Sequence, residues 1–319
     1  MINVERLGVV LSPDRECEAK FNAGMILEGD VVHMLYRWAE HDPDNKESVT
    51  YCKDHIRYAK LSKDGKLIKD YDAPVIKSIS GEYVGFGAQD PRIVPFEGYY
   101  YIFFCDYNLK SARVGISRTK DFITYERLGT IPTLKWDKDA YIFPERINGK
   151  IAYIHRFEPD IQIDYFDTFE EMFDENYWNN YDEKIHEQVV LKGEHDWECL
   201  KIGGSIPPIK TELGWLFFYH GVSNDRDPFC YRMGACVLDY KNPSKVLARL
   251  PYPILQPDED YEIEGDIHNV VFPQGTYILD DDMYISYGAA DKYVALAKIK
   301  YSEVINELKK YPVDTSLGG

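Results

Sequence analysis

The amino-acid sequence predicts an all-β fold, and specifically a five-bladed β-propeller. The first observation is composition, since the 319 residues include 26 Tyr and 15 Phe, both of which favour strands. The second is a repeated pattern of strand, tight turn and strand, which is typical of a β-hairpin. Five copies of this pattern, spaced roughly 50 to 70 residues apart, indicate a repeat architecture. Four strands per repeat are typical of a propeller blade, and a β-sandwich with the same hairpins is the alternative.

The hairpins are expected where a Gly- or Asp-bearing turn separates two aromatic or β-branched runs. They cover residues 24–40, 92–108, 145–158, 209–223 and 276–291. The segment RVGISRTKDFITYERL, residues 113–128, lies between two of them and predicts a further strand, turn and strand. Helix is expected only at 169–178 and 302–311.

A propeller places the inner strand of every blade around one central axis. Residues that end these strands are therefore expected to meet in a shared pocket. The residues that end the expected strands are Arg37, Asp106, Arg156, His220 and Gly288. We expect them to lie close together in space although they are far apart in the chain.

The chain shows no Gly/Ser-rich linker and no abrupt change in composition. One domain over residues 1–319, with short terminal extensions, is therefore expected. The N-terminal residues lack the basic and apolar regions of a signal peptide, and no apolar run approaches the ~18 residues of a membrane span. These features predict a soluble, cytoplasmic protein that does not bind a membrane.

The formal net charge of −17 argues against a nucleic-acid partner, because neutralising phosphates requires clustered Lys and Arg. A neutral ligand is easier to accommodate, and an anion would need a local basic pocket. The six cysteines have no spacing typical of zinc or redox sites and are interpreted as free thiols. No metal is expected, because no His and carboxylate spacing matches a zinc motif.

Asp90 is the candidate general acid. It lies in the triplet Asp-Pro-Arg, and the following proline restricts it to extended geometry. Arg92 is expected to hold it by a charge-assisted bond, and the surrounding Tyr and Phe residues would raise its pKa towards general-acid use. Taken alone, an Asp-Pro pair is more often a turn former, so the prediction depends on this context.

Four basic residues form the second candidate group, and each lies at a strand end or in a loop beside one. They are Lys138, Arg156, Lys201 and His220. Singly, each is more often a surface charge or a structural donor. Brought together in a protein of negative charge, they would form a site for a dianion, and phosphate is the obvious small one.

Two further groups suit a sugar. The segment EGDIHNVVFPQG, residues 264–275, places Asp266 in a polar cluster that could bind hydroxyl groups. The tryptophans that could stack against a sugar ring are Trp38, Trp136, Trp197 and Trp215. Core packing is the alternative for most aromatic residues.

The sequence motifs of this chain together resemble those of one family, the five-bladed propeller enzymes of the mannoside phosphorylase family, glycoside hydrolase family 130. The similarity runs through FNAGMI, MLYR, QDPRI, DKDAYIFPERINGK, YIHR, LKIGGSIPPIKTELGWLFFYHGV, GDIHNVVFP and YGAAD. It covers nearly the whole chain, in the family's order.

The resemblance implies a glycosyl-transferring enzyme that cleaves a β-mannoside with inversion. Inorganic phosphate is the co-substrate in place of water, the product is α-mannose 1-phosphate, and no metal or organic cofactor is required. Asp90 matches the family's acid, which relays its proton through the 3-hydroxyl of the mannosyl unit. The family's phosphate-binding residues match Arg156, Lys201 and His220, with Lys138 as a further equivalent. Its sugar-binding residues match Asn22, Arg37 and Asp266, and Arg92 of the acid motif is also expected among the substrate-binding residues.

Two alternatives stay open. One is a β-mannosidase of the same fold, which would need a second carboxylate about 6.5–9.5 Å from the acid to activate water, with Glu198 as the candidate. The other is a carbohydrate-binding propeller without catalysis. The sequence leaves open β-1,2 or β-1,4 linkage and the oligomeric state. For a homo-oligomer, the C-terminal helix and the first twenty residues are the expected contacts.

Overall fold

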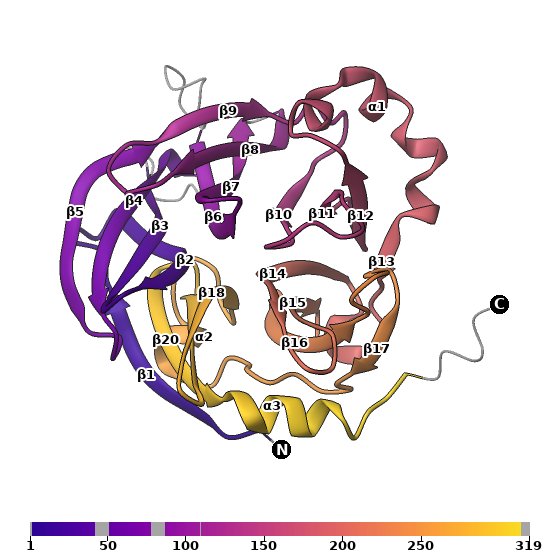
Figure 1. Cartoon of the computed structure of the whole chain (residues 1–319). Helices are drawn as coiled ribbons and strands as arrows, with labels where there is room; N and C mark the ends of the chain where they lie inside the picture. The colour runs from indigo at the N-terminus through magenta and orange to yellow at the C-terminus, as the bar shows by residue number, and fades with distance from the viewer. Residues whose placement is uncertain (1, 42–50, 78–86, 109, 314–319) are drawn as a thin grey trace.

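The structure of the chain is a computed structural model that describes residues 2–41, 51–77, 87–108 and 110–313. Five blades of four strands surround a central axis, which confirms the predicted five-bladed propeller (Figure 1). Within each blade, neighbouring strands are antiparallel. A single parallel bridge between Asp54 and Gly87 joins the first two blades.

The strands follow one another blade by blade. The first blade contains β2 (Glu18–Glu28), β3 (Val31–His41), β4 (Tyr51–Ser62) and β5 (Leu67–Ile76). The second contains β6 (Gly87–Phe96), β7 (Tyr99–Asn108), β8 (Ser111–Thr119) and β9 (Glu126–Thr130). The third contains β10 (Lys138–Ile142), β11 (Ile151–Arg156), β12 (Ile161–Phe166) and β13 (Val189–Leu191). The fourth contains β14 (Lys201–Lys210), β15 (Trp215–Ser223), β16 (Cys230–Leu238) and β17 (Val246–Arg249). The fifth contains β18 (Val271–Leu279), β19 (Asp282–Ala289), β20 (Tyr293–Lys300) and β1 (Val4–Leu11).

Burial explains the composition of these strands. Every residue of β11 and β15 is buried, because both faces of a blade pack against neighbouring blades. Such strands read as continuous apolar and aromatic runs instead of alternating ones. The outer strand β5 is largely exposed and carries charged residues, as expected of an edge that must not pair with another chain.

Four of the five predicted hairpins are confirmed, but in the third, 145–158, only β11 lies within the predicted range and its antiparallel partner β10 ends at Ile142. One detail of the arrangement was also wrong. The strands nearest the axis are the first strands of the hairpins, β2, β6, β10, β14 and β18 (Figure 1). Asp106 lies on a second strand, β7, and its carboxylate accepts hydrogen bonds from Arg127 and Thr130 of the outer part of the blade. The expectation that Asp106 reaches the shared pocket is therefore wrong.

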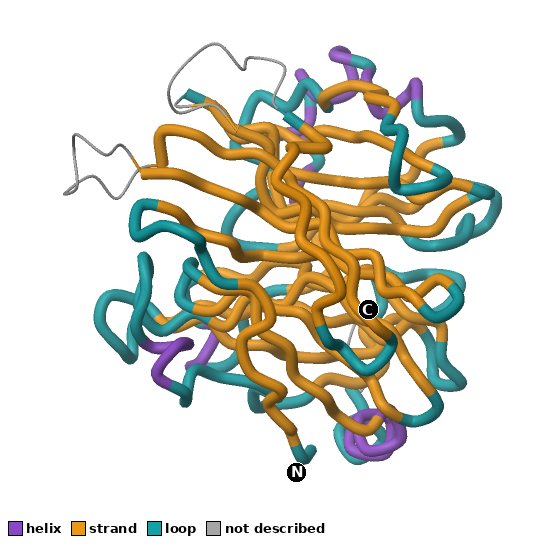
Figure 2. The backbone as a smooth tube through the Cα atoms, turned by 90° about the vertical axis from the view of Figure 1, so that its left-hand side faces the viewer, coloured by secondary structure: helices purple, strands orange, loops and turns teal. Residues whose placement is uncertain are grey.

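Helices are few and peripheral, as Figure 2 shows. The predicted helix at 169–178 appears as the 3₁₀ turn η1 (Glu170–Phe173) and α1 (Glu175–Asn179). Three more 3₁₀ turns are η2 (Tyr181–Glu183), η3 (Ile185–Glu187) and η4 (Asp196–Glu198), and α2 (Asp260–Ile263) is a single turn. In the part of the chain that the structure describes, no helix has the length and apolar character needed to cross a membrane.

The last blade is closed by the first strand of the chain. β1 pairs with β20 from Val4 opposite Ile299 to Leu11 opposite Val294. The helix α3 (Tyr301–Leu308) follows β20 and buries Val304 against the same blade. Both segments that the sequence suggested for contacts between subunits are therefore used within the chain.

Candidate active site

A cavity of about 270 Å³ lies at the end of the axis where the inner strands β2, β6 and β10 begin. Asp90 and Arg37 line it on one side, and Arg156, His220 and Lys138 line it on the other. These residues come from five different strands and meet as the propeller prediction required. The apolar part of the wall includes Tyr231 and Phe272, with Phe229 at the exposed rim.

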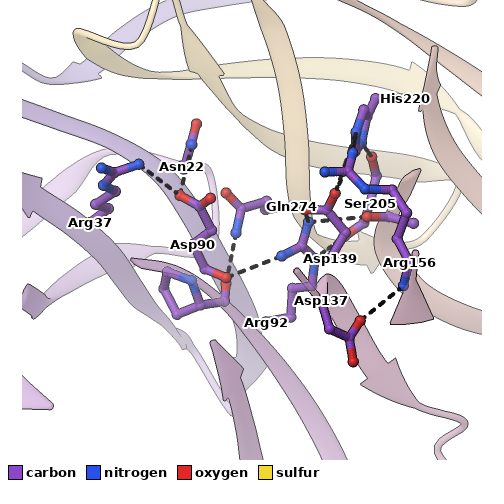
Figure 3. Close-up of polar contacts among 12 residues, drawn as sticks. Asn22, Arg37, Asp90, Arg92, Asp137, Asp139, Arg156, Ser205, His220 and Gln274 are labelled. Atoms are coloured by element: carbon purple, nitrogen blue, oxygen red, sulfur yellow. Dashed lines mark hydrogen bonds and ion pairs between the residues drawn. The ribbon is translucent and has the colours of Figure 1, made fainter. Parts of the chain in front are cut away.

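Asp90 is held at a break in β6. The register of β6 against β7 shifts between Gln89 and Arg92, and Asp90 has a positive φ of 55°, so the extended geometry expected for it is wrong. A bulge of this kind turns a side chain out of the regular strand pattern, and a left-handed Asp is uncommon outside sites that require it. Asn22 Nδ2 donates to Asp90 Oδ1 at 2.9 Å, and Arg37 Nη1 lies 3.6 Å from the same oxygen. Figure 3 shows both side chains directed at the Asp90 carboxylate.

The orientation of the Arg37 side chain is fixed by Asp54. Its Nε and Nη2 donate to the two carboxylate oxygens of Asp54 at 2.7 and 3.1 Å, and Gln89 Nε2 donates to Asp54 at 2.9 Å. Burial raises the pKa of Asp54, and the Arg37 guanidinium opposes this only in part. The guanidinium thus reaches Asp90 in an orientation set by a buried ion pair.

Arg92 corrects the sequence prediction. It does not bond the Asp90 carboxylate, and it lies behind the cavity wall with 1% exposure instead of among the residues that would touch a sugar. Its guanidinium donates to the main-chain oxygens of Asp90, Gly204 and Ser205 and to the Asp139 carboxylate at 3.0 Å. Arg92 therefore ties the inner strands β6, β10 and β14 together below the site.

Asp139 is the buried anion on the basic side of the cavity. Arg92 Nη2 lies 3.0 Å and Arg156 Nη1 lies 2.8 Å from its carboxylate. Burial by itself would raise the pKa of Asp139, but the two guanidinium groups outweigh it and hold that pKa well below its usual range. Asp139 was not among the predicted site residues, because an acid in the Lys-Asp-Ala sequence at the start of β10 gives no sign of this position.

His220 acts as a neutral group here. Burial lowers the pKa of His220 well below its ordinary value, although Asp139 opposes this. Arg156 Nη1 lies 3.3 Å from His220 Nε2, and a guanidinium has only donors, so Nε2 must accept. The proton then sits on Nδ1 and points to Ser205 Oγ at 3.1 Å. His220 therefore orients Arg156 and adds no charge.

A second buried histidine supports Arg156 from the other side. Asp137 accepts from the Arg156 main-chain N–H at 3.3 Å and from His155 Nδ1 at 3.2 Å, and Asp164 bonds His155 Nε2 at 2.9 Å. Burial opposes the charge on His155, but Asp137 and Asp164 outweigh it and raise the pKa of His155 to about 9. This buried charged cluster fixes the end of β11.

The remaining predicted cations lie nearby. Lys138 begins β10, lines the cavity and pairs in register with Arg156. Lys201 begins β14, and its Nζ donates to Glu158 at 2.9 Å. Burial and the Arg156 charge lower the pKa of Lys201, although Glu158 opposes this. The structure therefore brings Lys138, Arg156 and His220 together in the cavity lining, while Lys201 lies outside that lining and is linked to Arg156 through Glu158.

Asp266 lies just outside the cavity lining, where Ile267 takes its place. Its carboxylate bonds His41 Nε2 at 2.8 Å and Lys292 Nζ at 3.0 Å. On the Asp90 side, a second carboxylate that lines the cavity is Asp291, in the turn between β19 and β20. Burial raises the pKa of Asp291 to about 7, the charges of Asp90 and Asp266 add to this, and Arg37 opposes it.

Sequence reasoning missed Asp291 although a signal was present. Asp291 is the last residue of the fifth hairpin pattern, 276–291, whereas the expected strand end in that pattern is Gly288. Gly288 does lie against the site, since a Cβ there would come within 1.8 Å of Asn22 Oδ1. It allows Asn22 to approach Asp90 and contributes no functional group of its own.

Two other sequence hypotheses are settled by burial. Glu198, the candidate base of a hydrolase, is completely buried and bonds Arg249 at 2.6 Å, so Glu198 is a structural anion and not a base that contacts water. Of the four tryptophans considered for sugar stacking, Trp38 and Trp215 are core residues and Trp197 packs on Tyr219. Trp136 is 51% exposed and lines a second cavity beside the first.

A metal site was not expected. Among the residues that the structure describes, no group of three or more His, Cys, Asp or Glu side chains could hold a metal ion. The five cysteines whose side chains are described are free, and Cys105, Cys230 and Cys236 are buried.

Residues 3–310 match the model of a family described as beta-1,4-mannooligosaccharide phosphorylase. A 1,2-beta-oligomannan phosphorylase from Thermoanaerobacter sp. (strain X514) is 34% identical over 313 residues, which cover 95% of this chain and 99% of that protein. A beta-1,2-mannobiose phosphorylase from the same organism is 36% identical, over 92% of this chain and 96% of that protein.

The fold agrees with these matches. The solved complex of beta-1,2-mannobiose phosphorylase from Listeria innocua with beta-1,2-mannobiose superposes with a TM-score of 0.78 at 26% identity, covering 97% of this chain and all of that one. Sequence and fold therefore lead to one conclusion: the chain belongs to the mannoside phosphorylase family, glycoside hydrolase family 130.

Proposed function

We propose that the chain catalyses the inverting phosphorolysis of β-1,2-linked manno-oligosaccharides and releases α-mannose 1-phosphate. The observation that carries the proposal is one cavity with a held carboxylate, Asp90, on one side and the cations Arg156 and Lys138 on the other. The near full-length relatives and the matching solved complex bear names that specify β-1,2 linkages, which supports this linkage over β-1,4.

The proposed reaction needs one acid from the protein. A phosphate oxygen attacks the anomeric carbon from the α face, and the β-glycosidic bond to the departing sugar breaks. The proton of Asp90 passes to the glycosidic oxygen, through the 3-hydroxyl of the mannosyl unit in the route that the family resemblance implies. Phosphate is already an anion at neutral pH and needs no base to attack, whereas water would.

The basic side of the cavity supplies the proposed phosphate site. Arg156, Lys201 and Lys138 provide the positive charge, which a protein of net charge −17 must concentrate locally. His220 contributes to this site by holding Arg156 in a fixed orientation through Nε2. The role assigned to each of these residues is part of the proposal.

The acid side supplies the proposed mannosyl site. Asn22, Arg37 and Asp291 present hydrogen-bonding groups to the cavity, and Phe272 and Tyr231 give it an apolar face. Such a mixture suits a pyranose ring, whose hydroxyls need partners and whose C–H face packs on apolar groups. Asp266 would contribute indirectly, by orienting His41 and Lys292 through its carboxylate.

A cytoplasmic location is also part of the proposal. Phosphorolysis keeps the product as a charged sugar phosphate, which is of use only in the compartment that consumes it. The free cysteines of the described chain agree with a reducing compartment.

The test is phosphorus NMR on the protein incubated with β-1,2-mannobiose and with β-1,4-mannobiose, each with and without inorganic phosphate. A parallel assay measures free mannose. We expect an α-mannose 1-phosphate signal from the β-1,2 substrate that requires phosphate. Equal release of mannose without phosphate would show a hydrolase, and no turnover of either sugar would favour a carbohydrate-binding protein.

A further inference from the structure

Glu158 lies against the cations assigned to phosphate. One oxygen of its carboxylate, Oε1, accepts from Arg156 Nη2 at 3.1 Å and from Lys201 Nζ at 2.9 Å. Burial opposes ionisation, but Arg156 and Lys201 outweigh it and lower the pKa of Glu158. An ionised carboxylate therefore bridges the two groups that a phosphate would need to bridge.

The main chain beside Glu158 is fixed while its side chain reaches solvent. Gln162 of β12 bonds both the N–H and the carbonyl of Phe157, at 2.7 and 3.2 Å. The Glu158 side chain is 51% exposed. A change in this region is therefore confined to rotation of the Glu158 side chain, which costs little in an exposed residue.

The second cavity provides space into which the Glu158 side chain can rotate. It has a volume of about 290 Å³ and is lined by Glu158 and Trp136. It shares Arg156 and Lys138 with the first cavity, the one that Asp90 lines. Glu158 thus stands between the shared cations and an open space. Rotation into that space would release Arg156 and Lys201 without moving the main chain.

Arg156 also retains capacity for an anion. Its Nε is buried and has no hydrogen-bond partner within the described part of the chain. A buried donor without a partner is costly, and an anion bound at this guanidinium would supply the missing acceptor. Glu158 occupies Nη2 and leaves Nε unsatisfied, so it is an incomplete substitute for a tetrahedral anion.

We propose that Glu158 is an internal anion that occupies Arg156 and Lys201 when phosphate is absent and rotates into the neighbouring cavity when phosphate binds. This inference rests on the proposed function, because it concerns the affinity of the same phosphate site. Two anions cannot share one pair of cations without repulsion, so the carboxylate competes with phosphate. Glu158 therefore sets the phosphate concentration at which the enzyme works.

The test varies inorganic phosphate at saturating β-1,2-mannobiose and compares the wild type with Glu158→Gln and Glu158→Ala. We expect KM for phosphate to fall by roughly threefold or more in both variants, with kcat largely retained, because a partly exposed ion pair is weak. The alanine variant covers the case in which the amide of glutamine still bonds Lys201. Glu145→Gln is the matched control, because Glu145 is 49% exposed and bonds Lys210 away from the site.

A second readout does not depend on turnover. Thermal melts with and without inorganic phosphate alone should show a larger phosphate-induced rise of Tm in both Glu158 variants than in the wild type. An unchanged or raised KM for phosphate, or an unchanged Tm response, would overturn the role of Glu158. A wild type that cleaves mannobiose equally without phosphate, and whose Tm ignores phosphate, would overturn the proposed function itself.

Discussion

At the scale of single residues, the site depends on side chains whose orientation is fixed by hydrogen bonds and ion pairs with other side chains. Asp90 is held by Asn22 and Arg37, and Arg37 by Asp54. The residues at strand ends, such as Arg37, Arg156 and His220, could be predicted, because a propeller brings these ends together. The partner of Asp90 could not, since the bulge at Asp90 reverses the side-chain alternation that the sequence pattern assumes.

Asp90→Asn tests the assigned acid. The amide keeps an oxygen for Asn22 Nδ2 but carries no acidic proton, so the fold should be retained. We expect a loss of kcat/KM by about 10²–10⁴-fold, the usual contribution of a general acid. Initial rates of α-mannose 1-phosphate release measure it, with Tm as the control for folding. A variant that keeps most of its activity would show that another group supplies the proton.

Asp291→Asn tests the raised pKa of Asp291. The folded pKa of about 7 lies above the unfolded value of about 3.9, so between them the folded state binds more protons. The contribution of Asp291 to stability is therefore full at low pH and is lost as the pH rises towards 7. We expect the Tm of the variant relative to the wild type to increase between pH 4 and 7 and then to level off. A pH-independent difference would mean that Asp291 has an ordinary pKa.

At the scale of elements, the hairpins could be predicted from the sequence, but the strand of each hairpin that lies nearer the axis could not. The turns NGK at 148–150 and EGY at 97–99 mark their hairpins through residues that adopt positive φ, including Asn148 and Glu97. Both strands of a buried hairpin are apolar, so the sequence gives no sign of which strand lies nearer the axis. The prediction that strands such as those of Arg37 and Asp106 lie nearest the axis failed for this reason.

The strands β19 and β2 lie so close at Gly288 that a single added methyl group would disturb their contact. A Cβ on Gly288 would come within 1.8 Å of Asn22 Oδ1, and Asn22 holds Asp90. We expect Gly288→Ala to lower the free energy of unfolding by about 1–3 kcal/mol through overpacking and to lower kcat at least tenfold. Urea unfolding and initial rates measure the two effects.

Gly149→Ala is the control for this glycine. It lies in the turn before β11 with no atom within 4 Å of an added Cβ, but its φ of 83° is unfavourable for alanine. We expect it to lose stability while keeping kcat. Equal loss of activity in both variants would show that lowered stability alone, and not displacement of Asn22, reduces the rate.

At the scale of the whole molecule, the pairing of β1 with β20 closes the ring. Arg6 of β1 bonds the buried Glu262 at 2.9 Å, and Tyr287 donates to the same carboxylate at 2.7 Å. The first strand is thus tied to the fifth blade by a hydrogen-bonded ladder and by a buried ion pair. The candidate active-site cavity draws residues from strands around this ring, so its geometry depends on closure.

This closure supports the proposal that residues 1–319 form one domain, which makes a prediction about unfolding. We expect a single transition in calorimetry, with equal calorimetric and van't Hoff enthalpies, because every blade packs on two neighbours. Deletion of residues 1–11 should leave the fifth blade with three strands and the carboxylate of Glu262 without Arg6, and should lower Tm by roughly 5 °C or more. Two separate transitions in the intact chain would show instead that the blades fall into independent units, and an unchanged Tm after deletion would show that ring closure adds no stability.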